Sequence, residues 1–282
     1  MRRCIDLHMH SHCSDGERSP SNLVQFLKSH GAELIALTDH DHIDGIEAAK
    51  SEAEKIDIRF LSGVEISTVY RDGEIHVLGY FSDPPNSSLQ AFLKKRFRDR
   101  EHRMAEMIQR LREIGVCIDY QQVLEQSPGP YVCRPNIAKA MVQSGYVMSM
   151  DEAFSELYIG NHGKAYVPPY GCSPSEAIRE IKKSGGKAFI AHPGIYFSPY
   201  YLEGLQEQDF SIWIHDGLDG IEAFHPKHTF EMTKRFCRTK RKLQMAFSVG
   251  SDYHYGEYKK FWELVPQQSL EEIWEWFTSA FS

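Results

Sequence analysis

Short apolar runs alternate with helix-like patterns over the first 84 residues of the chain. Apolar runs rich in β-formers predict strands, and apolar positions three or four residues apart predict helices. The apolar run within residues 33–38 is unbroken, as in a strand buried on both faces of a parallel sheet. We predict strands at residues 3–7, 33–38, 59–65 and 74–81, and helices at 20–29 and 45–55.

The same alternation returns in the last third of the chain. We predict strands at residues 187–191, 220–224 and 246–250, and helices at 173–184, 228–238 and 270–281. Strands that alternate with helices in this way are typical of a parallel sheet or barrel. The fold class is therefore α/β.

The middle of the chain breaks this rhythm. After Asp83-Pro84-Pro85, residues 90–114 predict one long charged helix with apolar positions at Phe97, Met104, Ile108 and Leu111, and shorter helices follow at 135–144 and 150–158. No strand pattern is visible before about residue 170. We predict that residues 1–84 and 171–282 form the two parts of the α/β domain and that residues 85–170 form an all-helical insertion.

The composition is ordinary for a soluble globular protein, with 41% hydrophobic and 25% charged residues in a chain of 282. It contains no uninterrupted apolar run of the length that crosses a membrane, and its first residues show no apolar signal segment, so we expect a cytoplasmic protein. The six cysteines are scattered without a C-x-x-C pair, which favours reduced thiols. A formal net charge of −7 argues against tight, non-specific nucleic-acid binding by the whole surface.

Histidines are the feature that points to chemistry. The chain has 14 of them, and six lie in the first 42 residues: His8, His10, His12, His30, His40 and His42. Histidine is the commonest metal ligand in proteins. His8 and His10 follow a predicted strand two residues apart, so both side chains leave the same face and can chelate one ion.

Further histidines and carboxylates lie at or near the ends of successive predicted strands. The full set is His8, His10, Asp15, His40, Glu65, His76, His192, Asp252 and His254. In a parallel barrel, the carboxyl ends of the strands form the face on which active sites are built. A single histidine in this set could equally be an ordinary hydrogen-bonded side chain, but nine such groups at one face are too many for one ion and suit two or three.

The chemistry of such a centre follows from its ligands. Imidazoles mixed with carboxylates suit Mn²⁺, Fe²⁺ or Zn²⁺ better than Ca²⁺. Three divalent ions would outweigh the charges of Asp15, Glu65 and Asp252, so the centre would attract a phosphate. A water that bridges two ions loses a proton near neutral pH and can attack phosphorus in line. No P-loop, G-x-S-x-G or C-x₅-R motif is present, so kinase and covalent-nucleophile chemistry lack their residues.

Seven motifs occur in a characteristic order over nearly the whole chain. They are Asp6-Leu7-His8-Met9-His10-Ser11, Ser14-Asp15-Gly16, Thr38-Asp39-His40-Asp41, Gly63-Val64-Glu65-Ile66-Ser67, His76-Val77-Leu78-Gly79-Tyr80, Ala191-His192-Pro193 and Gly250-Ser251-Asp252-Tyr253-His254. Together they resemble the PHP (polymerase and histidinol phosphatase) phosphoesterases. The resemblance implies a distorted seven-stranded (β/α) barrel that carries a trinuclear metal centre, with manganese the expected metal and iron or zinc the alternatives.

The resemblance also implies how the ligands are shared among the three ions. The first ion would be held by His8, His10, Glu65 and Asp252, the second by Glu65, His76 and His192, and the third by Asp15, His40 and His254. Glu65 would then bridge two ions. Asp39 and Glu222 are expected to orient imidazoles rather than to bind metal.

The middle segment resembles the helical insertion of the TrpH-like branch of this family. The residues that carry this likeness are Arg134-Pro135-Asn136-Ile137-Ala138-Lys139 and Ala165-Tyr166-Val167-Pro168. The likeness implies a substrate cap and a substrate that is a nucleoside monophosphate, a nucleoside 3′,5′-bisphosphate or a short 5′-phosphorylated RNA. Asn136 stands where this branch usually has histidine, and His42 where threonine is common.

Several other residues are candidates for contact with substrate. Besides Asp252, His12 and His225 are candidate catalytic residues, and Arg134, Arg100, Arg103 and His228 are candidate substrate-binding residues. The alternative for His12 is a solvent-facing loop side chain, and for Arg134 a surface ion pair. The basic run at residues 94–100 is either a solvated helix face or a guide for an oligonucleotide backbone.

Three functions remain open from the sequence. The first is a metal-dependent phosphoesterase for 5′-phosphorylated nucleotides or short RNA. The second is a phosphatase for a small amino-alcohol phosphate, similar to histidinol phosphatase. The third is a metal-binding module without activity, although all nine ligand positions are filled. An insertion that carries Arg134 and a basic helix suits a nucleotide better than a small amine, and nothing indicates an obligate protein partner or a membrane.

Overall fold

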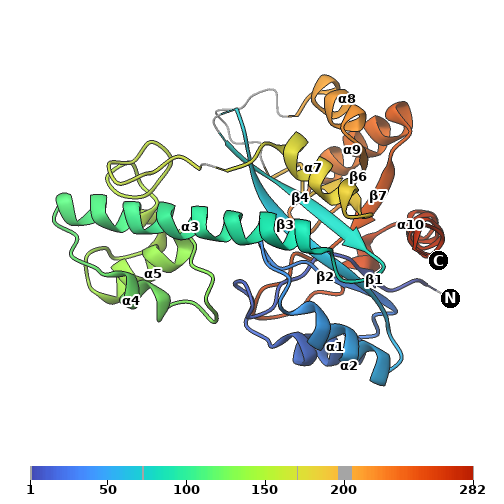
Figure 1. Ribbon diagram of the computed structural model, residues 1–282, viewed down its shortest axis with the longest axis horizontal. Coiled ribbons are helices and arrows are strands. Elements are labelled where there is room, and N and C mark those ends of the chain that lie inside the picture. Colours follow the sequence, from blue (N-terminus) through green and yellow to red (C-terminus); the bar gives the residue numbers. More distant parts are fainter. Residues whose placement is uncertain (1, 72, 170, 196–204, 282) are drawn as a thin grey trace.

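One sheet of seven strands organises the molecule, and its strands lie in chain order from β1 to β7 (Figure 1). The computed structural model describes residues 2–71, 73–169, 171–195 and 205–281, so residue 170, where the insertion is predicted to end, lies outside the described residues. The strands are β1 Ile5–Asp6, β2 Leu34–Leu37, β3 Arg59–Tyr70, β4 Gly73–Phe81, β5 Lys187–Ile190, β6 Leu218–Phe224 and β7 Ala246–Val249.

The two edges of this sheet meet, which makes the sheet a barrel. The Leu7 amide, just beyond the end of β1, donates at 3.0 Å to the carbonyl of Val249, the last residue of β7. Farther along, the Asp252 amide donates to the His8 carbonyl and the His10 amide to the Tyr253 carbonyl, both at 2.9 Å. The predicted α/β class and distorted seven-stranded barrel are therefore confirmed.

The expectation of a wholly parallel sheet is wrong at β4. This strand runs antiparallel to both of its neighbours, β3 and β5, because Tyr70 pairs with Gly73 across a tight hairpin that has no room for a crossover helix. The prediction that Glu65 ends its strand is also wrong, since β3 continues to Tyr70. The reversal places the first half of β4, including His76, at the end of the barrel where the parallel strands finish.

Helices cover the outside of the barrel on both sides of the β3–β4 hairpin (Figure 1). They are α1 Pro20–Ser29, α2 Ile46–Lys55, α7 Pro174–Lys183, α8 Glu207–His215, α9 Phe230–Leu243, the 3₁₀ helix η1 Phe261–Leu264 and α10 Gln267–Ala280. Helix α8 was not predicted. Helix α9 begins at Phe230 rather than at residue 228, because the Thr229 side chain accepts a hydrogen bond from the Met232 amide and so caps the helix.

Among the described residues, only helices lie between β4 and α7, as predicted for the insertion. They are α3 Ser87–Glu113, α4 Tyr120–Leu124, α5 Arg134–Gln143 and α6 Met150–Ala153, of which α4 was not predicted. Their buried apolar side chains form a cluster separate from the barrel core and including Leu111, Ile137 and Met141. The division of the chain at residues 84 and 170 stays a prediction.

Helix α3 connects the two apolar clusters (Figure 1). Leu89 and Leu93 belong to the barrel core, whereas residues from Met104 onward belong to the insertion core. Between them the buried side of the helix carries Arg96 and Arg103, only 8% and 5% exposed. The buried side of α3 thus carries apolar residues at both ends and arginines in the middle. The arginines indicate that the middle of the helix passes a polar site.

Two expectations from composition can be compared with the structure. None of the helices that the described residues form is long and apolar enough to pass through a bilayer. All six cysteines lie in the described part of the chain and none is in a disulfide, as predicted for reduced thiols.

The separate insertion core leads to a stability prediction. Ile137 is fully buried in it, so Ile137→Ala should lower the free energy of unfolding by about 2–4 kcal/mol through lost burial and a residual cavity. Leu157 in the same insertion is 56% exposed, and Leu157→Ala should change that free energy by less than about 0.5 kcal/mol. Urea unfolding followed by circular dichroism measures both, and equal effects would contradict the assignment of this core.

Candidate metal centre

All nine predicted ligands lie at one end of the barrel. His8 and His10 follow β1, His40 follows β2, His192 follows β5, and Asp252 follows β7. Glu65 and His76 reach the same end from the β3–β4 hairpin, where Ser67 pairs with His76. Eight of the ligands form three overlapping groups within each of which the ligand atoms lie within 4.8 Å of one another, and the ninth, His192, lies 2.9 Å from Glu65.

The first group surrounds the buried carboxylate of Glu65. Its Oε2 lies 3.1 Å from His8 Nε2 and 3.2 Å from His10 Nε2. Asp252 Oδ1 faces the same two nitrogens at 3.5 and 3.4 Å. His8, His10, Glu65 and Asp252 therefore form one four-sided site, the set expected for the first ion.

The second group uses the other side of the Glu65 carboxylate. Oε1 lies 2.8 Å from His76 Nδ1 and 2.9 Å from His192 Nε2, while Oε2 also faces His40 Nδ1 at 3.1 Å. Each of the two oxygens of Glu65 therefore faces a different set of imidazoles. This is the geometry required of a bridging carboxylate.

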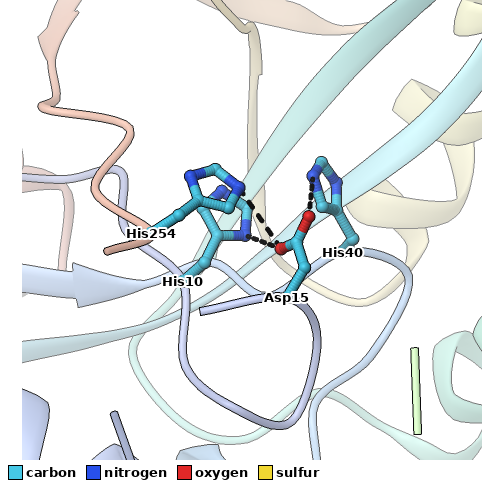
Figure 2. Close-up of side chains that lie close together, drawn as sticks. All are labelled: His10, Asp15, His40 and His254. Carbon is cyan, nitrogen blue, oxygen red and sulfur yellow. Dashed lines mark ion pairs between the residues drawn. The ribbon is translucent and has the colours of Figure 1, made fainter. Parts of the chain in front are cut away.

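The third group gathers around Asp15 (Figure 2). Asp15 Oδ1 lies 3.2 Å from His254 Nε2 and 3.7 Å from His10 Nδ1, and Oδ2 lies 3.9 Å from His40 Nε2. The rings of His10 and His254 stack at 4.0 Å between centroids. His10 and His40 each turn one nitrogen to this group and the other to Glu65, so they connect the groups.

The donor set fits cations because its lone pairs point at one another. His8 Nδ1 lies 3.0 Å from Glu222, and a neutral His8 ring that donates from Nδ1 turns the lone pair of Nε2 toward the Glu65 carboxylate. Buried atoms without a hydrogen-bond partner include His8 Nε2, His10 Nε2, His40 Nδ1, Asp15 Oδ1 and Glu65 Oε2. Such atoms repel across about 3 Å unless a cation lies between them, and ligand–metal bonds of about 2.0–2.2 Å place adjacent ligands about 3 Å apart.

Mutual electrostatics keeps the carboxylates ionised. Burial raises the pKa of Glu65, but His40, His8 and His76 oppose this effect and hold the pKa well below its ordinary value. The pKa of Asp252 is likewise raised by burial and lowered more strongly by His8, His10 and His225. Burial lowers the pKa of His40 well below its usual value, whereas the surrounding carboxylates overcome burial and raise the pKa of His8 well above its usual value and that of His10 to about 10.

Hydrogen bonds outside the ligand set hold the ligands in place. Glu222 accepts from His8 Nδ1 at 3.0 Å and from the His192 amide at 2.7 Å, so it orients an imidazole as expected. Asp39 instead accepts from Ser11 and Ser14, at 2.7 and 2.6 Å, and so holds the loop that carries Asp15. His192 and Asp252 have positive φ angles of 23° and 54°, a strained conformation that such bonds must maintain.

The three other candidate histidines lie in different environments. His225 is buried, and its Nε2, 3.4 Å from Asp252 Oδ2, has no hydrogen-bond partner. His12 is exposed and its ring contacts the Cys13 thiol at 3.8 Å, away from the ligand groups. His228 is half-buried, with its Nδ1 bonded to the Ala223 carbonyl and its Nε2 accepting from the Gly194 amide, both at 3.1 Å, and its contact with a substrate stays a prediction.

A cleft of about 350 Å³ opens above the metal centre, and its lining includes all three candidate arginines. Arg100 donates to Asp41 at 3.2 Å and lies 4.6 Å from the ring of Tyr131. Arg103 donates to the Val167 carbonyl at 3.0 Å and contacts Glu74 at 3.3 Å. The insertion therefore supplies one wall of the cleft.

Arg134 is the third arginine of this lining and the first residue of α5, as the following proline predicted. Its guanidinium donates to the Asn161 side chain at 2.9 Å. No carboxylate among the described residues forms an ion pair with it, which removes the alternative of a surface ion pair within this part of the chain.

Two residues of the site were missed by sequence reasoning. Tyr131 is 1% exposed and stacks on His40 with a centroid distance of 5.4 Å, yet no motif marks it. Glu74 contacts His76 Nε2 at 3.2 Å as well as Arg100 and Arg103. Its position two residues before His76, on the same face of a strand, is a signal that could have identified it.

The chain matches known proteins over nearly its whole length. A family model described as PHP domain matches residues 6–102. A 5′-3′ exoribonuclease of Haemophilus influenzae is 33% identical over 98% of this chain and 100% of its own. A 3′,5′-nucleoside bisphosphate phosphatase of Chromobacterium violaceum is 31% identical over 89% of this chain and 87% of its own.

A solved structure also agrees with the fold. An amidohydrolase from Chromobacterium violaceum, with bound sulfate and no metal, has a TM-score of 0.79 and 30% identity, and covers 89% of this chain and 87% of its own. The motifs, the barrel and these relatives agree, and the chain therefore belongs to the PHP domain family.

Proposed function

We propose that this protein is a metal-dependent phosphoesterase that hydrolyses 5′-phosphorylated nucleotides, including nucleoside 3′,5′-bisphosphates, or short 5′-phosphorylated RNA. The observation that carries the proposal is the buried set of nitrogen and oxygen ligands around Glu65 and Asp15, which suits metal cations and opens into an arginine-lined cleft. The names of the relatives from Haemophilus influenzae and Chromobacterium violaceum support a nucleotide or RNA substrate.

Three divalent ions, preferably Mn²⁺, would occupy the three ligand groups. The first would lie among His8, His10, Glu65 and Asp252, the second among Glu65, His76 and His192, and the third among Asp15, His40 and His254. Six imidazoles and three carboxylates form a donor set that suits Mn²⁺, Fe²⁺ or Zn²⁺. The bound ions would acidify a water and stabilise charge on the phosphate.

The protein's own side chains would orient the reacting groups. Glu65 would fix the spacing of two sites, because both of its oxygens face imidazoles. His225 Nε2, which lacks a hydrogen-bond partner and lies 3.4 Å from Asp252, would pass a proton to the leaving oxygen. Arg134 would hold the substrate farther out, at the start of α5, where the helix dipole also favours an anion.

One comparison of substrates tests the proposal. The protein, purified with Mn²⁺, should release phosphate from adenosine 3′,5′-bisphosphate or a nucleotide from 5′-phosphorylated oligoribonucleotides, and should act far more slowly on histidinol phosphate. The reverse preference would favour the small amino-alcohol phosphatase. Full metal loading with no turnover of any of these would favour a module without activity.

Asp252→Asn should abolish turnover while the fold is kept. The change removes a carboxylate charge that faces His8, His10 and His225, and the loss in kcat should be at least about 10³-fold because an ion is weakened or lost. Steady-state kinetics in saturating Mn²⁺ measures it, with Asp83→Asn, at an 82% exposed side chain, as the matched control. Near-normal activity of Asp252→Asn would refute the assignment of this ligand.

Arg134→Ala should lower kcat/KM for nucleotide substrates by about 30- to 1000-fold, equivalent to about 2–4 kcal/mol for a lost charge-assisted contact, with unchanged metal content. Hydrolysis of p-nitrophenyl phosphate should fall less, since this small ester does not extend beyond the ions. Asn161→Ala removes the neutral partner of Arg134 and is the control that should cost little. Equal losses on both substrates would place Arg134 on the reacting phosphate, and no loss would remove it from the site.

A further inference from the structure

A second concavity lies beside the metal centre, between the start of α2 and the first half of α3. We name it the α2–α3 groove. Its volume is about 510 Å³, and the residues that shape it include His42, Ile43, Ile46, Lys94, Phe97 and Arg98. It shares none of these residues with the cleft above the metal ions, so the site described so far does not account for it.

The α3 side of the groove carries cations without partners. Lys94 and Arg98 are exposed and lie four residues apart, so both side chains project from the same side of α3. Neither forms an ion pair with any residue that the structure describes, whereas Arg96, Arg100 and Arg103 on the same helix all do. The positive charges of Lys94 and Arg98 are therefore available to an anion that binds beside α3.

An aromatic ring lines the groove beside these two cations. Sequence periodicity placed Phe97 with the apolar face of α3, yet its ring is only half-buried and belongs to neither apolar core. The His42 ring lies 5.7 Å from the Phe97 ring and forms the facing side. A half-exposed aromatic ring beside exposed cations can bind a base together with its phosphates.

Ring contacts connect the groove to the metal centre. Phe97 lies 6.3 Å from Tyr131, and Tyr131 in turn stacks on the ligand His40 at 5.4 Å. Arg100, one turn beyond Phe97 on α3, lines the catalytic cleft. The cleft and the groove are therefore neighbours on α3, about one helical turn apart.

The opposite side of the groove is acidic. Asp44 lies 3.5 Å from His42, and Glu47 follows in the first turn of α2. This separation of charge would direct phosphates to α3 and away from α2. It also disfavours an acidic peptide that would fill the whole width of the groove.

We propose that the α2–α3 groove binds the nucleotide on the 3′ side of the bond that is cut in a 5′-phosphorylated oligoribonucleotide. Its base stacks on Phe97, and its phosphate lies between Lys94 and Arg98. The inference rests on the proposed function and extends it, because a mononucleotide bound at the ions does not reach this groove. The groove then favours RNA chains over single nucleotides.

Binding and turnover are measured separately to test this. Binding uses the Mn²⁺-loaded enzyme and a 5′-phosphorylated tetraribonucleotide with a phosphorothioate backbone and a 3′ fluorophore, followed by fluorescence anisotropy. Lys94→Glu should weaken binding by roughly tenfold and lower the slope of log Kd against log salt by about 0.7 for the lost phosphate contact. The matched control Lys95→Glu changes a neighbouring exposed lysine outside the groove and should leave Kd unchanged.

A second variant tests the stacking surface. Phe97→Leu keeps an apolar side chain and removes the ring, and it should weaken binding of the tetraribonucleotide about 5- to 100-fold. Hydrolysis of adenosine 3′,5′-bisphosphate by Lys94→Glu and Phe97→Leu should stay within about twofold of the wild-type rate, which also shows that both variants fold and load metal.

Two results would overturn the inference. One is equal affinity of Lys94→Glu and Lys95→Glu for the tetraribonucleotide, together with unchanged binding by Phe97→Leu. The other is a loss of bisphosphate hydrolysis in Lys94→Glu and Phe97→Leu as large as their loss of tetraribonucleotide binding, which would place the effect in the catalytic cleft. A third result would separate the two proposals. If Lys94→Glu and Phe97→Leu both weaken binding of the tetraribonucleotide, but the wild-type enzyme hydrolyses neither substrate, the groove is a binding site and the proposed function is refuted.

Discussion

The buried Glu65 carboxylate is the group on which the rest of this structure depends. It is fully buried, and both of its oxygens face imidazole nitrogens between 2.8 and 3.2 Å away. Where both atoms of such a contact carry lone pairs, the contact is repulsive and its desolvation is not compensated. Protons on the imidazoles or bound metal cations remove this cost, and the three ligand groups have the composition and spacing that fit metal cations.

The barrel provides the rigid frame that this arrangement needs. The antiparallel hairpin of β3 and β4 brings Glu65 and His76 together on neighbouring strands, and the closure of β1 against β7 brings His8 next to Asp252. His192 and Asp252 hold left-handed backbone conformations, which only a well-bonded surrounding structure maintains. Strain at two ligands is thus balanced by hydrogen bonds from groups such as Glu222 that bind no metal.

Helix α3 joins the chemistry to the choice of substrate. Its two ends are anchored in two apolar cores, so its middle can carry arginines without loss of position. Arg100 and Arg103 are held by Asp41 and Glu74 along the cleft, whereas Lys94 and Arg98 remain unpaired within the described structure on another side of the same helix. Helix α3 therefore carries both paired and unpaired basic side chains at fixed distances from the metal centre.

The ligands were readable from the sequence because each belongs to a short motif next to an apolar strand, where the local pattern determines both the strand and the residue that follows it. Asp252, His192 and His40 are examples, and the helical insertion and the start of α5 at Arg134 were equally local features. The direction of β4 was not readable in this way, because a strand pattern does not record the orientation of its partners. Tertiary structure alone placed Tyr131 on His40, turned both nitrogens of His228 to the backbone, and left Phe97 half-exposed beside a groove. These outcomes depend on contacts between segments far apart in the chain, and no spacing along the sequence encodes them.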